Sequence, residues 1–410
     1  MRVLLCNKFY RPIGGPENVL LHTMNELKAL GHTPIPFAMA HPDNWESEYS
    51  EYFVSNVDYS TKHGKGIRRL LREATDLIYS PEARRNVQRL IADTKPDIAH
   101  AHNIYHQLSP SVLYALKKAN IPTVLTLHDG KLLCPNVLFF THGRVCEKCA
   151  GWKFHHAVLN KCVKESYASS LLCCIEGYLH RWFRMYEQVD LYIAPSRFFK
   201  QKLIEHHRLP EDRIEVLHTY GNTRNISPSY EPGGYGLFLG KVEAFKGVKT
   251  LVQACKAVPN LDVWIAGRGE FCDEGQRIAQ AQGISNVKFV GFRSGHDVVR
   301  MLRECRFVLV PSEWYENCPM VVLEGFAAGK PVIASKIGGI PELIDHGVDG
   351  LLFEPGDAEG LASAMLELIE NPDLASEMGR KGREKVEQRY SIEMYMKSLL
   401  GIYDKVLNSS

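Results

Sequence analysis

The chain has 410 residues, of which 45% are hydrophobic and 23% are charged, and its formal net charge is +2. This composition excludes a disordered or fibrous protein, and the near-neutral charge offers no support for nucleic-acid binding. The length exceeds that of one ordinary core, so we expect two domains of roughly 200 residues each.

The start of the chain and its cysteines bear on location. The apolar run at residues 2–7 is short and is followed by neither a longer apolar segment nor a small-residue cleavage site, which favours a first strand over a signal peptide. No stretch approaches the ~18 continuous apolar residues that span a bilayer. Eleven cysteines is an odd number, and several lie inside apolar strand or helix patterns. These features predict a soluble or peripheral protein of the reducing cytoplasm.

Short β-rich runs alternate with helical patterns along the chain. In the first half, strands are expected at residues 2–7, 33–40, 97–103 and 122–129, and helices at 17–30 and 110–120. In the second half, strands are expected at 236–241, 261–267, 287–291, 307–312, 331–335 and 351–353. Such alternation predicts βαβ units around a parallel sheet. We therefore expect an α/β protein with two Rossmann-like domains.

Composition also suggests the domain boundary. Residues 218–234 are rich in Asn, Ser, Pro, Gly and Tyr and lack periodicity, which is typical of an interdomain linker. The first domain is then expected at 1–217 and the second at 235–390. Apolar residues recur at helical spacing in 391–407, so the segment 391–410 is expected to hold a helix that packs on either domain, including by crossing back to the first.

A strand–loop–helix unit around residue 316 has the features of a phosphate site. Residues 307–312 have a strand pattern, and Pro319 suits the first turn of a following helix. Free N–H groups at such a helix start can hold a phosphate, and the helix dipole favours the same charge. Glu324 lies about one turn deeper, where a carboxylate can accept hydrogen bonds from ribose hydroxyls. Glu316 lies just outside the helix and is expected to face a sugar. The candidate binding residues of this unit are Asn317, Cys318, Pro319, Met320, Val321 and Glu324.

Glu316 and Glu324 stand eight residues apart and resemble the E-x7-E motif of glycosyltransferase family 4. Segments at 331–335, 338–342 and 350–357 continue the match, which is strong over 235–390 and weaker over 1–215. The resemblance implies a GT-B fold, with two Rossmann-like domains facing each other across a cleft. It also implies a retaining transferase in which the first motif glutamate contacts the donor sugar and the second binds the ribose. Two surface glutamates on an ordinary helix are the alternative.

The segment 240–247 resembles the family's loop in which an arginine and a lysine neutralise the donor diphosphate. The matching positions here are Lys241 and Lys246. Two cations beside a leaving diphosphate would stabilise its developing charge in place of a metal ion. A lysine at 241 departs from the family pattern, because it cannot supply the bidentate fork of an arginine. Two solvated lysines in a turn are the alternative.

Glycine-containing turns follow three expected strands. The turns after 261–267 and 287–291 would let the backbone approach a base or phosphate, and both resemble base-recognition loops. The loop after the first strand holds a Gly-Gly pair, as in similar family members, where the backbone can approach a phosphate or the acceptor. A simple turn is the alternative at each place. The candidate residues are Gly267, Arg268, Phe292, Gly14 and Gly15.

Histidines stand at the C-terminal ends of two expected parallel strands, where open α/β sheets place their ligands. His100 and His102 follow one strand, and His128 with Asp129 follows the next. We expect all four to line the cleft, and His128 matches the family position near the donor sugar. A structural histidine is the alternative at each position.

The resemblance also implies how the sugar would be transferred. The acceptor hydroxyl would attack the face that the nucleotide leaves, and the diphosphate would take its proton. No dedicated protein base is then required, unlike in glycosidases with two flanking carboxylates. The candidate catalytic residues are Glu316, His128, Lys241 and Lys246.

An insert at about residues 131–165 carries a C-x2-C pair and two outlying cysteines. Tetrahedral zinc is the simplest explanation, because a metal would stabilise a loop otherwise short of core. An iron–sulfur cluster or four reduced thiols in a mobile lid are the alternatives. Because the insert follows His128 directly, we expect it to shape the acceptor site. The candidate metal ligands are Cys134, Cys146, Cys149 and Cys162.

Two further segments would suit a membrane surface. Residues 63–89 interleave basic side chains with apolar ones, and residues 171–186 are rich in aromatic side chains. A basic amphipathic surface can lie on anionic lipid at the inner membrane face. A core helix with a solvated basic face is the alternative. The basic residues are Lys65, Arg68, Arg69, Arg72, Arg84, Arg85 and Arg89.

Together these features favour a hexosyltransferase that uses a UDP- or GDP-linked donor, without a catalytic metal. The acceptor would be a glycan or lipid-linked molecule, as in cell-surface polysaccharide or glycolipid synthesis. A nucleotide-sugar epimerase would use the same donor but no acceptor, and a non-catalytic nucleotide-sugar-binding protein would turn nothing over. A zinc-based nucleic-acid binder would show steeply salt-dependent binding, which the near-neutral charge does not favour.

Overall fold

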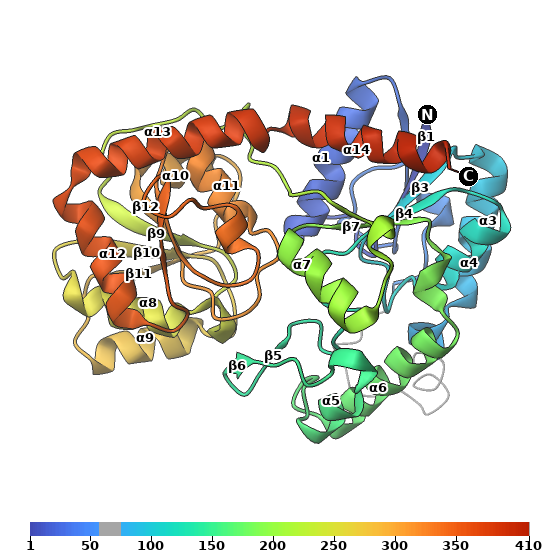
Figure 1. The fold of residues 1–410 in the computed structure, drawn as a ribbon, viewed down its shortest axis with the longest axis horizontal. Coiled ribbons are helices and arrows are strands. Elements are labelled where there is room, and N and C mark those ends of the chain that lie inside the picture. The colour runs from blue at the N-terminus through green and yellow to red at the C-terminus, as the bar shows by residue number, and fades with distance from the viewer. Residues whose placement is uncertain (57–74, 410) are drawn as a thin grey trace.

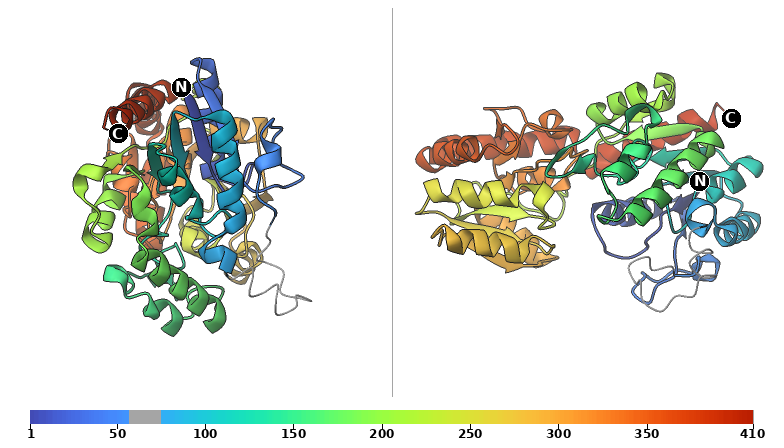
Figure 2. Two further views of the ribbon diagram at one scale, coloured as in Figure 1. Left: turned by 90° about the vertical axis from the view of Figure 1, so that its right-hand side faces the viewer. Right: turned by 90° about the horizontal axis from the view of Figure 1, so that it is seen from below.

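The computed structural model describes residues 1–56 and 75–409. It has two lobes that lie side by side along the longest axis of the molecule (Figures 1 and 2). Each lobe is built on one six-stranded parallel sheet, and each sheet carries two separate clusters of buried apolar residues. The predicted α/β architecture with two Rossmann-like domains is confirmed.

The N-terminal sheet has the strand order β2-β1-β3-β4-β7-β8. The chain reverses its direction of travel across the sheet between β1 and β3, so the loops after these two strands lie side by side. The four predicted strands are present in shorter form, whereas β7 and β8 were not foreseen. The strands are β1 (Arg2–Cys6), β2 (Thr33–Phe37), β3 (Ile98–Ala101), β4 (Thr123–Thr126), β7 (Leu191–Ala194) and β8 (Ile214–Val216). The helices are α1 (Gly15–Ala29), α3 (Pro81–Thr94), α4 (Ser111–Lys118), α5 (His155–Leu159), α6 (Tyr167–Trp182) and α7 (Arg197–Lys202).

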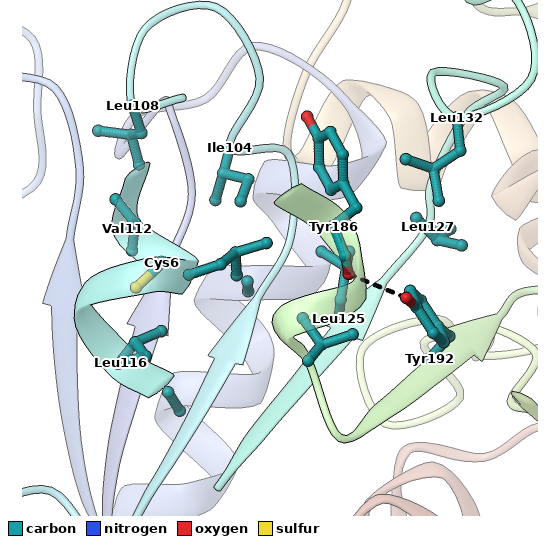
Figure 3. Packing of buried hydrophobic residues seen from close by; sticks show 14 of the residues in the cluster. Cys6, Ile104, Leu108, Val112, Leu116, Leu125, Leu127, Leu132, Tyr186 and Tyr192 are labelled. Atoms are coloured by element: carbon teal, nitrogen blue, oxygen red, sulfur yellow. Dashed lines mark hydrogen bonds between the residues drawn. The ribbon is translucent and has the colours of Figure 1, made fainter. Parts of the chain in front are cut away.

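Burial on both faces explains why most residues of these strands are apolar. Figure 3 shows part of the core on one face, where Leu125 of β4 lies among side chains from α4 and from the segment before β7. Two tyrosines enter this core, and the Tyr192 hydroxyl donates to the Tyr186 carbonyl at 2.9 Å. Buried hydroxyls need such partners.

The C-terminal sheet has the order β11-β10-β9-β12-β13-β14. Its reversal falls between β9 and β12, so the loops that leave these strands flank one crevice. All six predicted strands are present. They are β9 (Tyr235–Leu239), β10 (Asp262–Ala266), β11 (Val287–Gly291), β12 (Cys305–Val310), β13 (Val332–Ser335) and β14 (Gly350–Phe353). The helices are α8 (Val248–Ala254), α9 (Cys272–Ala281), α10 (His296–Glu304), α11 (Met320–Ala327), α12 (Ala358–Glu370) and α13 (Pro372–Arg389).

The last helix, α14 (Ile392–Leu407), follows α13 and extends over the N-terminal lobe (Figure 1). Its apolar side packs into the cluster that contains Val3, Leu5 and Val124 of the N-terminal sheet. Tyr403, near the C-terminal end of this helix, is fully buried. The end of the chain is therefore part of the core of the first lobe.

The basic helix α3 keeps its apolar side inside the protein. Ala83, Val87 and Leu90 are buried in the N-terminal core, and Arg85 and Arg89 are exposed. This is a core helix with a solvated basic face, and its apolar side is not available to lipid. Four other basic residues of the predicted membrane surface, Lys65, Arg68, Arg69 and Arg72, lie outside the described residues. Within the described ranges, no helix has the length and apolar character needed to cross a bilayer.

Candidate functional site

The loops after β9 and β12 meet at the switch point of the C-terminal sheet, and they carry the first pair of predicted site residues. Lys246 Nζ lies 2.6 Å from Glu316 Oε1. The same oxygen accepts hydrogen bonds from Ser312 Oγ at 2.6 Å and Trp314 Nε1 at 2.9 Å. Burial alone would raise the pKa of Glu316, but Lys246 and the two further donors hold that pKa below its ordinary value. Glu316 is therefore a buried carboxylate with a fixed orientation.

Two glycines that were not named as site residues hold this loop in place. Gly338 has φ +60°, and a Cβ built there would lie 2.3 Å from the carbonyl oxygen of Glu316. A Cβ on Gly339 would lie 1.9 Å from the carbonyl oxygen of Asn317, and the Gly339 N–H donates to the Glu316 carbonyl at 2.7 Å. Only glycine fits such an approach. The resemblance to the family at 338–342 includes both glycines, so the sequence could have indicated this contact.

Helix α11 begins at Met320, where the sequence analysis predicted a phosphate-binding helix start. Pro319 is the residue before its first turn, and Met320 begins the helix. The Cys318 thiol lies 3.1 Å from Thr219 Oγ1 in the interdomain segment, and Val321 packs partly against the C-terminal core. These side chains are used for packing, so a phosphate here would bind to backbone N–H groups.

Glu324 differs from Glu316 because its carboxylate has no hydrogen bond or ion pair within residues 1–56 and 75–409. The side chain is partly buried, and burial raises its pKa to about 7. A partly buried acid without a protein partner at a helix start is a typical mark of a ligand site.

The predicted base-recognition turns lie beside the lysine loop. The Val242 N–H donates to the Arg268 carbonyl at 3.0 Å, and the Gly267 N–H donates to the Gly291 carbonyl at 2.9 Å. Gly267 has φ +158°. The Arg268 guanidinium lies 4.9 Å from the centre of the exposed Phe292 ring. The turns after β9, β10 and β11 thus form one rim of the sheet.

Lys241 lies on the same rim and is exposed. Its positive charge helps to lower the pKa of Lys8, a residue that follows β1 in the other lobe. Lys8 Nζ lies 3.7 Å from the centre of the Tyr105 ring. Burial lowers the pKa of Lys8 to about 8, although Asp129 and Glu17 oppose this shift. Lys8 was not foreseen, since a single lysine after a first strand carries no signal in the sequence.

Loop residues of the first lobe face the start of α11. Gly14 precedes α1, and a Cβ built on Gly15 would lie 3.6 Å from Met320 Sδ. The predicted Gly-Gly loop and the predicted phosphate cradle therefore lie opposite each other.

The histidines at the strand ends differ in their surroundings. His102 Nδ1 and His128 Nε2 share a hydrogen bond of 2.9 Å, and Asn317 Nδ2 of the second lobe donates to the His128 carbonyl at 2.8 Å. Burial lowers the pKa of His128 to about 4 and that of His102 well below its ordinary value. Both imidazoles are therefore neutral near pH 7. The two lobes meet directly at His128.

The expectation that His100 lines the cleft is wrong. Its side chain is fully buried, with Nδ1 at 2.7 Å from the Tyr403 hydroxyl of α14 and Nε2 at 2.7 Å from Thr126 Oγ1. The last helix covers this histidine and makes it structural. Asp129, in contrast, accepts a hydrogen bond from the Tyr105 hydroxyl beside Lys8.

A second contact joins the lobes through Glu342. Its carboxylate accepts hydrogen bonds from the Arg197 and Phe198 N–H groups at 2.8 and 2.6 Å, at the start of α7. His218 Nε2 lies 3.0 Å from the same carboxylate. Burial would raise the pKa of Glu342, but His218 and the two N–H groups hold it below its ordinary value. No pattern in the sequence indicated this connection.

The four cysteines of the insert come together. Cys134, Cys146, Cys149 and Cys162 line one small cavity. The insert also contains a two-stranded hairpin of β5 (Phe140–Thr141) and β6 (Arg144–Val145).

Comparison with known proteins gives the family of the chain. The sequence model of the protein family described as Glycosyltransferase Family 4 matches residues 13–220, and that of the family described as Glycosyl transferases group 1 matches residues 221–385. An uncharacterized glycosyltransferase of Methanocaldococcus jannaschii is 27% identical over 411 residues, which cover 99% of each chain. The phosphatidyl-myo-inositol mannosyltransferase of Mycobacterium leprae is 25% identical over 424 residues, covering 100% of this chain and 98% of that protein.

Among solved structures, Anabaena HepE in complex with UDP-glucose has a TM-score of 0.69 at 18% identity, covering 99% of this chain and 100% of HepE. At that identity the likeness speaks for the fold. The family model over the first lobe covers half of the chain, and the sheets, the switch-point loops and the full-length relatives agree with it. The chain therefore belongs to glycosyltransferase family 4 and has the GT-B fold.

Proposed function

We propose that the protein is a retaining hexosyltransferase that moves a sugar from a nucleoside-diphosphate donor to a glycan or lipid-linked acceptor. One observation carries this proposal. Glu316, held by Lys246 at the switch point, is followed by Asn317, whose side chain is bonded to the backbone of His128 in the other lobe. A donor sugar between Glu316 and His128 would contact both lobes.

The diphosphate is assigned to the start of α11 and to two lysines. Backbone N–H groups and the helix dipole attract its charge there, and Lys241 and Lys246 would supply the cations that stabilise the leaving group. Because Lys246 is paired with Glu316, a bound diphosphate would compete for its ammonium group. Donor binding would then free the Glu316 carboxylate to accept hydrogen bonds from the sugar hydroxyls.

The nucleoside is assigned to the rim of the same sheet. Glu324 would accept hydrogen bonds from the ribose hydroxyls, which its unpartnered carboxylate can satisfy. The base would lie near Arg268 and Phe292. A UDP- or GDP-linked hexose fits this assignment, because two of the three named relatives are a protein solved in complex with UDP-glucose and a mannosyltransferase.

The chemistry would need no protein base. The acceptor hydroxyl attacks the anomeric carbon from the side that the diphosphate leaves, and its proton passes to a diphosphate oxygen. His102 and His128 stay neutral because burial lowers the pKa of each. The partly exposed His128 can therefore exchange a hydrogen bond with a sugar hydroxyl without adding a charge beside the reacting carbon, and the buried His102 holds it at 2.9 Å.

The acceptor is proposed to reach the protein from an anionic bilayer. Leu171, Ile175, Tyr178 and Trp182 are all exposed at helical spacing along α6, and Trp182 is 81% exposed. Lys161 lies beside this stripe, with Nζ 4.5 Å from the Tyr167 ring. Apolar side chains next to exposed cations suit a bilayer with acidic headgroups.

Co-sedimentation with vesicles that contain an anionic phospholipid tests the membrane contact. Trp182→Ala should lower the bound fraction, whereas Met394→Ala, at an exposed position of α14, should leave it unchanged. Equal binding by both variants would remove α6 from the proposal.

A panel of nucleotide sugars tests the proposed reaction. A cognate donor should raise the melting temperature, since it binds the folded state alone, and the product should keep the anomeric configuration of the donor when followed by NMR. Glu324→Ala should weaken nucleotide binding, whereas Glu316→Ala should mainly slow transfer. An inverted product, or a donor epimerised without any acceptor, would contradict the proposal.

A further inference from the structure

The insert between β4 and α6 places its four cysteines around one cavity, in the spacing C-x11-C-x2-C-x12-C. The Cys134 thiol lies 2.9 Å from Asn136 Oδ1, and the Cys162 thiol lies 3.7 Å from Thr141 Oγ1. Cys134 and Cys149 are buried, and Cys146 and Cys162 are partly buried. Four cysteines around one small cavity are the ligand set of a closed zinc site.

The insert has very little core of its own. Leu132, Leu133, Cys134 and Phe139, at its start, pack into the core of the N-terminal lobe. The rest of the insert has a small separate cluster, in which Cys149, Phe154 and Ala157 pack against Cys174 of α6. The hairpin strands β5 and β6 have two residues each. So small a unit cannot offset its conformational entropy by burial alone, and natural units of this size use metals or disulfides.

A different trio of metal-ligating atoms carries no such proposal. In the described part of the chain, the ligand atoms that all lie within 4.8 Å of one another belong to His106, Cys173 and Glu176. Lys131 Nζ lies 2.7 Å from Glu176 Oε2 and 3.1 Å from His106 Nε2, so an ammonium group takes the place of a cation there. The sulfurs of the insert are less tightly grouped than this trio, so binding one metal ion would require them to move closer together.

The C-x2-C turn carries an acidic residue that reaches the second lobe. Glu147 lies between Cys146 and Cys149, and its carboxylate accepts a hydrogen bond from the Tyr315 hydroxyl at 2.7 Å. Lys202 Nζ at 2.6 Å and His206 Nε2 at 3.2 Å hold the same carboxylate from the first lobe. Tyr315 directly precedes Glu316 of the proposed donor site.

The hairpin also touches both donor loops through aromatic rings. The Phe139 ring centre lies 6.0 Å from that of Tyr315, and the Phe140 ring centre lies 6.1 Å from that of Phe245, the neighbour of Lys246. In Figure 1 the β5–β6 hairpin extends from the first lobe toward the second. The insert therefore contacts the two loops that carry Lys246 and Glu316.

We propose that Cys134, Cys146, Cys149 and Cys162 bind one structural zinc ion, and that this ion holds Glu147 and the hairpin against the donor loops. The metal half of this inference stands on the insert alone, and the coupling half rests on the proposed function. Four thiolates suit Zn²⁺ in a closed tetrahedral site, and binding releases the thiol protons to solvent. Glu147 and Tyr315 are positioning residues, which act on the sugar through Glu316.

Metal analysis of the full-length chain tests the first half. We expect one zinc per chain by elemental mass spectrometry, and Co²⁺ substitution should give the intense visible bands and sulfur-to-metal absorption of a tetrahedral thiolate site. Cys146→Ser should lose the metal, whereas Cys272→Ser, at a partly buried cysteine of α9, should retain it. Substoichiometric metal after reconstitution, or iron with acid-labile sulfide, would overturn the zinc assignment.

Chelation of the unmodified chain covers the case in which Cys146→Ser fails to fold. Removing zinc should increase proteolysis within the insert, and adding zinc back should reverse this effect. An insert that is equally resistant with and without the metal would contradict a structural role.

Calorimetric binding of UDP and GDP to the zinc-loaded chain tests the second half. Glu147→Ala and Tyr315→Phe should weaken binding of the preferred nucleotide by roughly three- to tenfold while zinc stays bound, because each removes a charge-assisted hydrogen bond that positions the loop. Glu147→Gln keeps an oxygen acceptor for Tyr315 and should lose less. Glu205→Ala is the control, since Glu205 lies 4.0 Å from His206 but makes no contact with the donor loops.

The outcomes separate the two proposals. In transferase assays the donor KM should rise more than kcat falls. Zinc removal that leaves nucleotide affinity unchanged would overturn the coupling. Failure of the unmodified chain to bind either nucleotide would count against the proposed function, and the metal analysis would still decide the zinc site.

Discussion

Glu324→Gln should stabilise the folded protein while it weakens nucleotide binding. The carboxyl lacks a hydrogen bond or ion pair within the described residues, and burial raises its pKa from 4.5 to about 7. A raised pKa in the fold means that the native state binds the proton more tightly than the unfolded chain does. Stability from this group is therefore fully present below pH 4.5 and is lost as the pH rises toward 7.

The size of the effect follows from the two pKa values. A gap of about 2.5 units corresponds to about 3.4 kcal/mol at about 1.36 kcal/mol per unit. The side chain keeps partial contact with solvent, so we expect about 1–2 kcal/mol at pH 8 and close to zero near pH 4.5. Glutamine has the same shape without the charge and should remove this penalty.

Urea unfolding at pH 5 and pH 8 measures the effect. The midpoint of Glu324→Gln should exceed that of the unmodified chain by more at pH 8 than at pH 5. Midpoints are compared because a chain with two lobes need not unfold in one step. Glu370→Gln, an exposed position on α12, should show no such pH dependence. Equal midpoint shifts at both pH values, or unchanged nucleotide affinity in Glu324→Gln, would refute the reasoning.

Two further predictions concern buried polar pairs. Lys246→Met should destabilise the protein by about 1–3 kcal/mol at neutral pH, because it leaves Glu316 buried without its counter-charge. When measured by urea unfolding, this loss of stability should become smaller toward pH 5. The control Lys241→Met, at an exposed lysine, should keep full stability while weakening nucleotide binding. Tyr403→Phe should lower the unfolding free energy by about 1–2 kcal/mol, because it removes the hydrogen-bond partner of His100 Nδ1, and transfer kinetics below the melting temperature should be unchanged.

The sequence alone determined the alternation of strands and helices and the residues of the donor motif. Runs of five or six mostly apolar residues between helical segments predict a buried parallel strand, as for β9, β10 and β12. The strand β8 was not predicted because its three residues are too few for a pattern to stand out from neighbouring loops. The strand β7 was also not predicted, although it is as long as β3 and β4. Within the motif, only seven residues separate Glu316, in the loop before α11, from Glu324 on that helix, so local geometry largely decides how the two are related.

Tertiary structure decided which of these residues meet, and what covers them. Lys246 and Glu316 are 70 positions apart in the chain and come together because the strand order reverses between β9 and β12. The rings of His100, in β3, and His102, just after it, lie 4.1 Å apart, yet only His100 bonds to Tyr403, which lies 303 residues later. Glu147 contacts Tyr315 across 168 residues. Short-range periodicity sets which way a side chain points, but contacts at such separations depend on how the whole chain packs, and no local pattern encodes them.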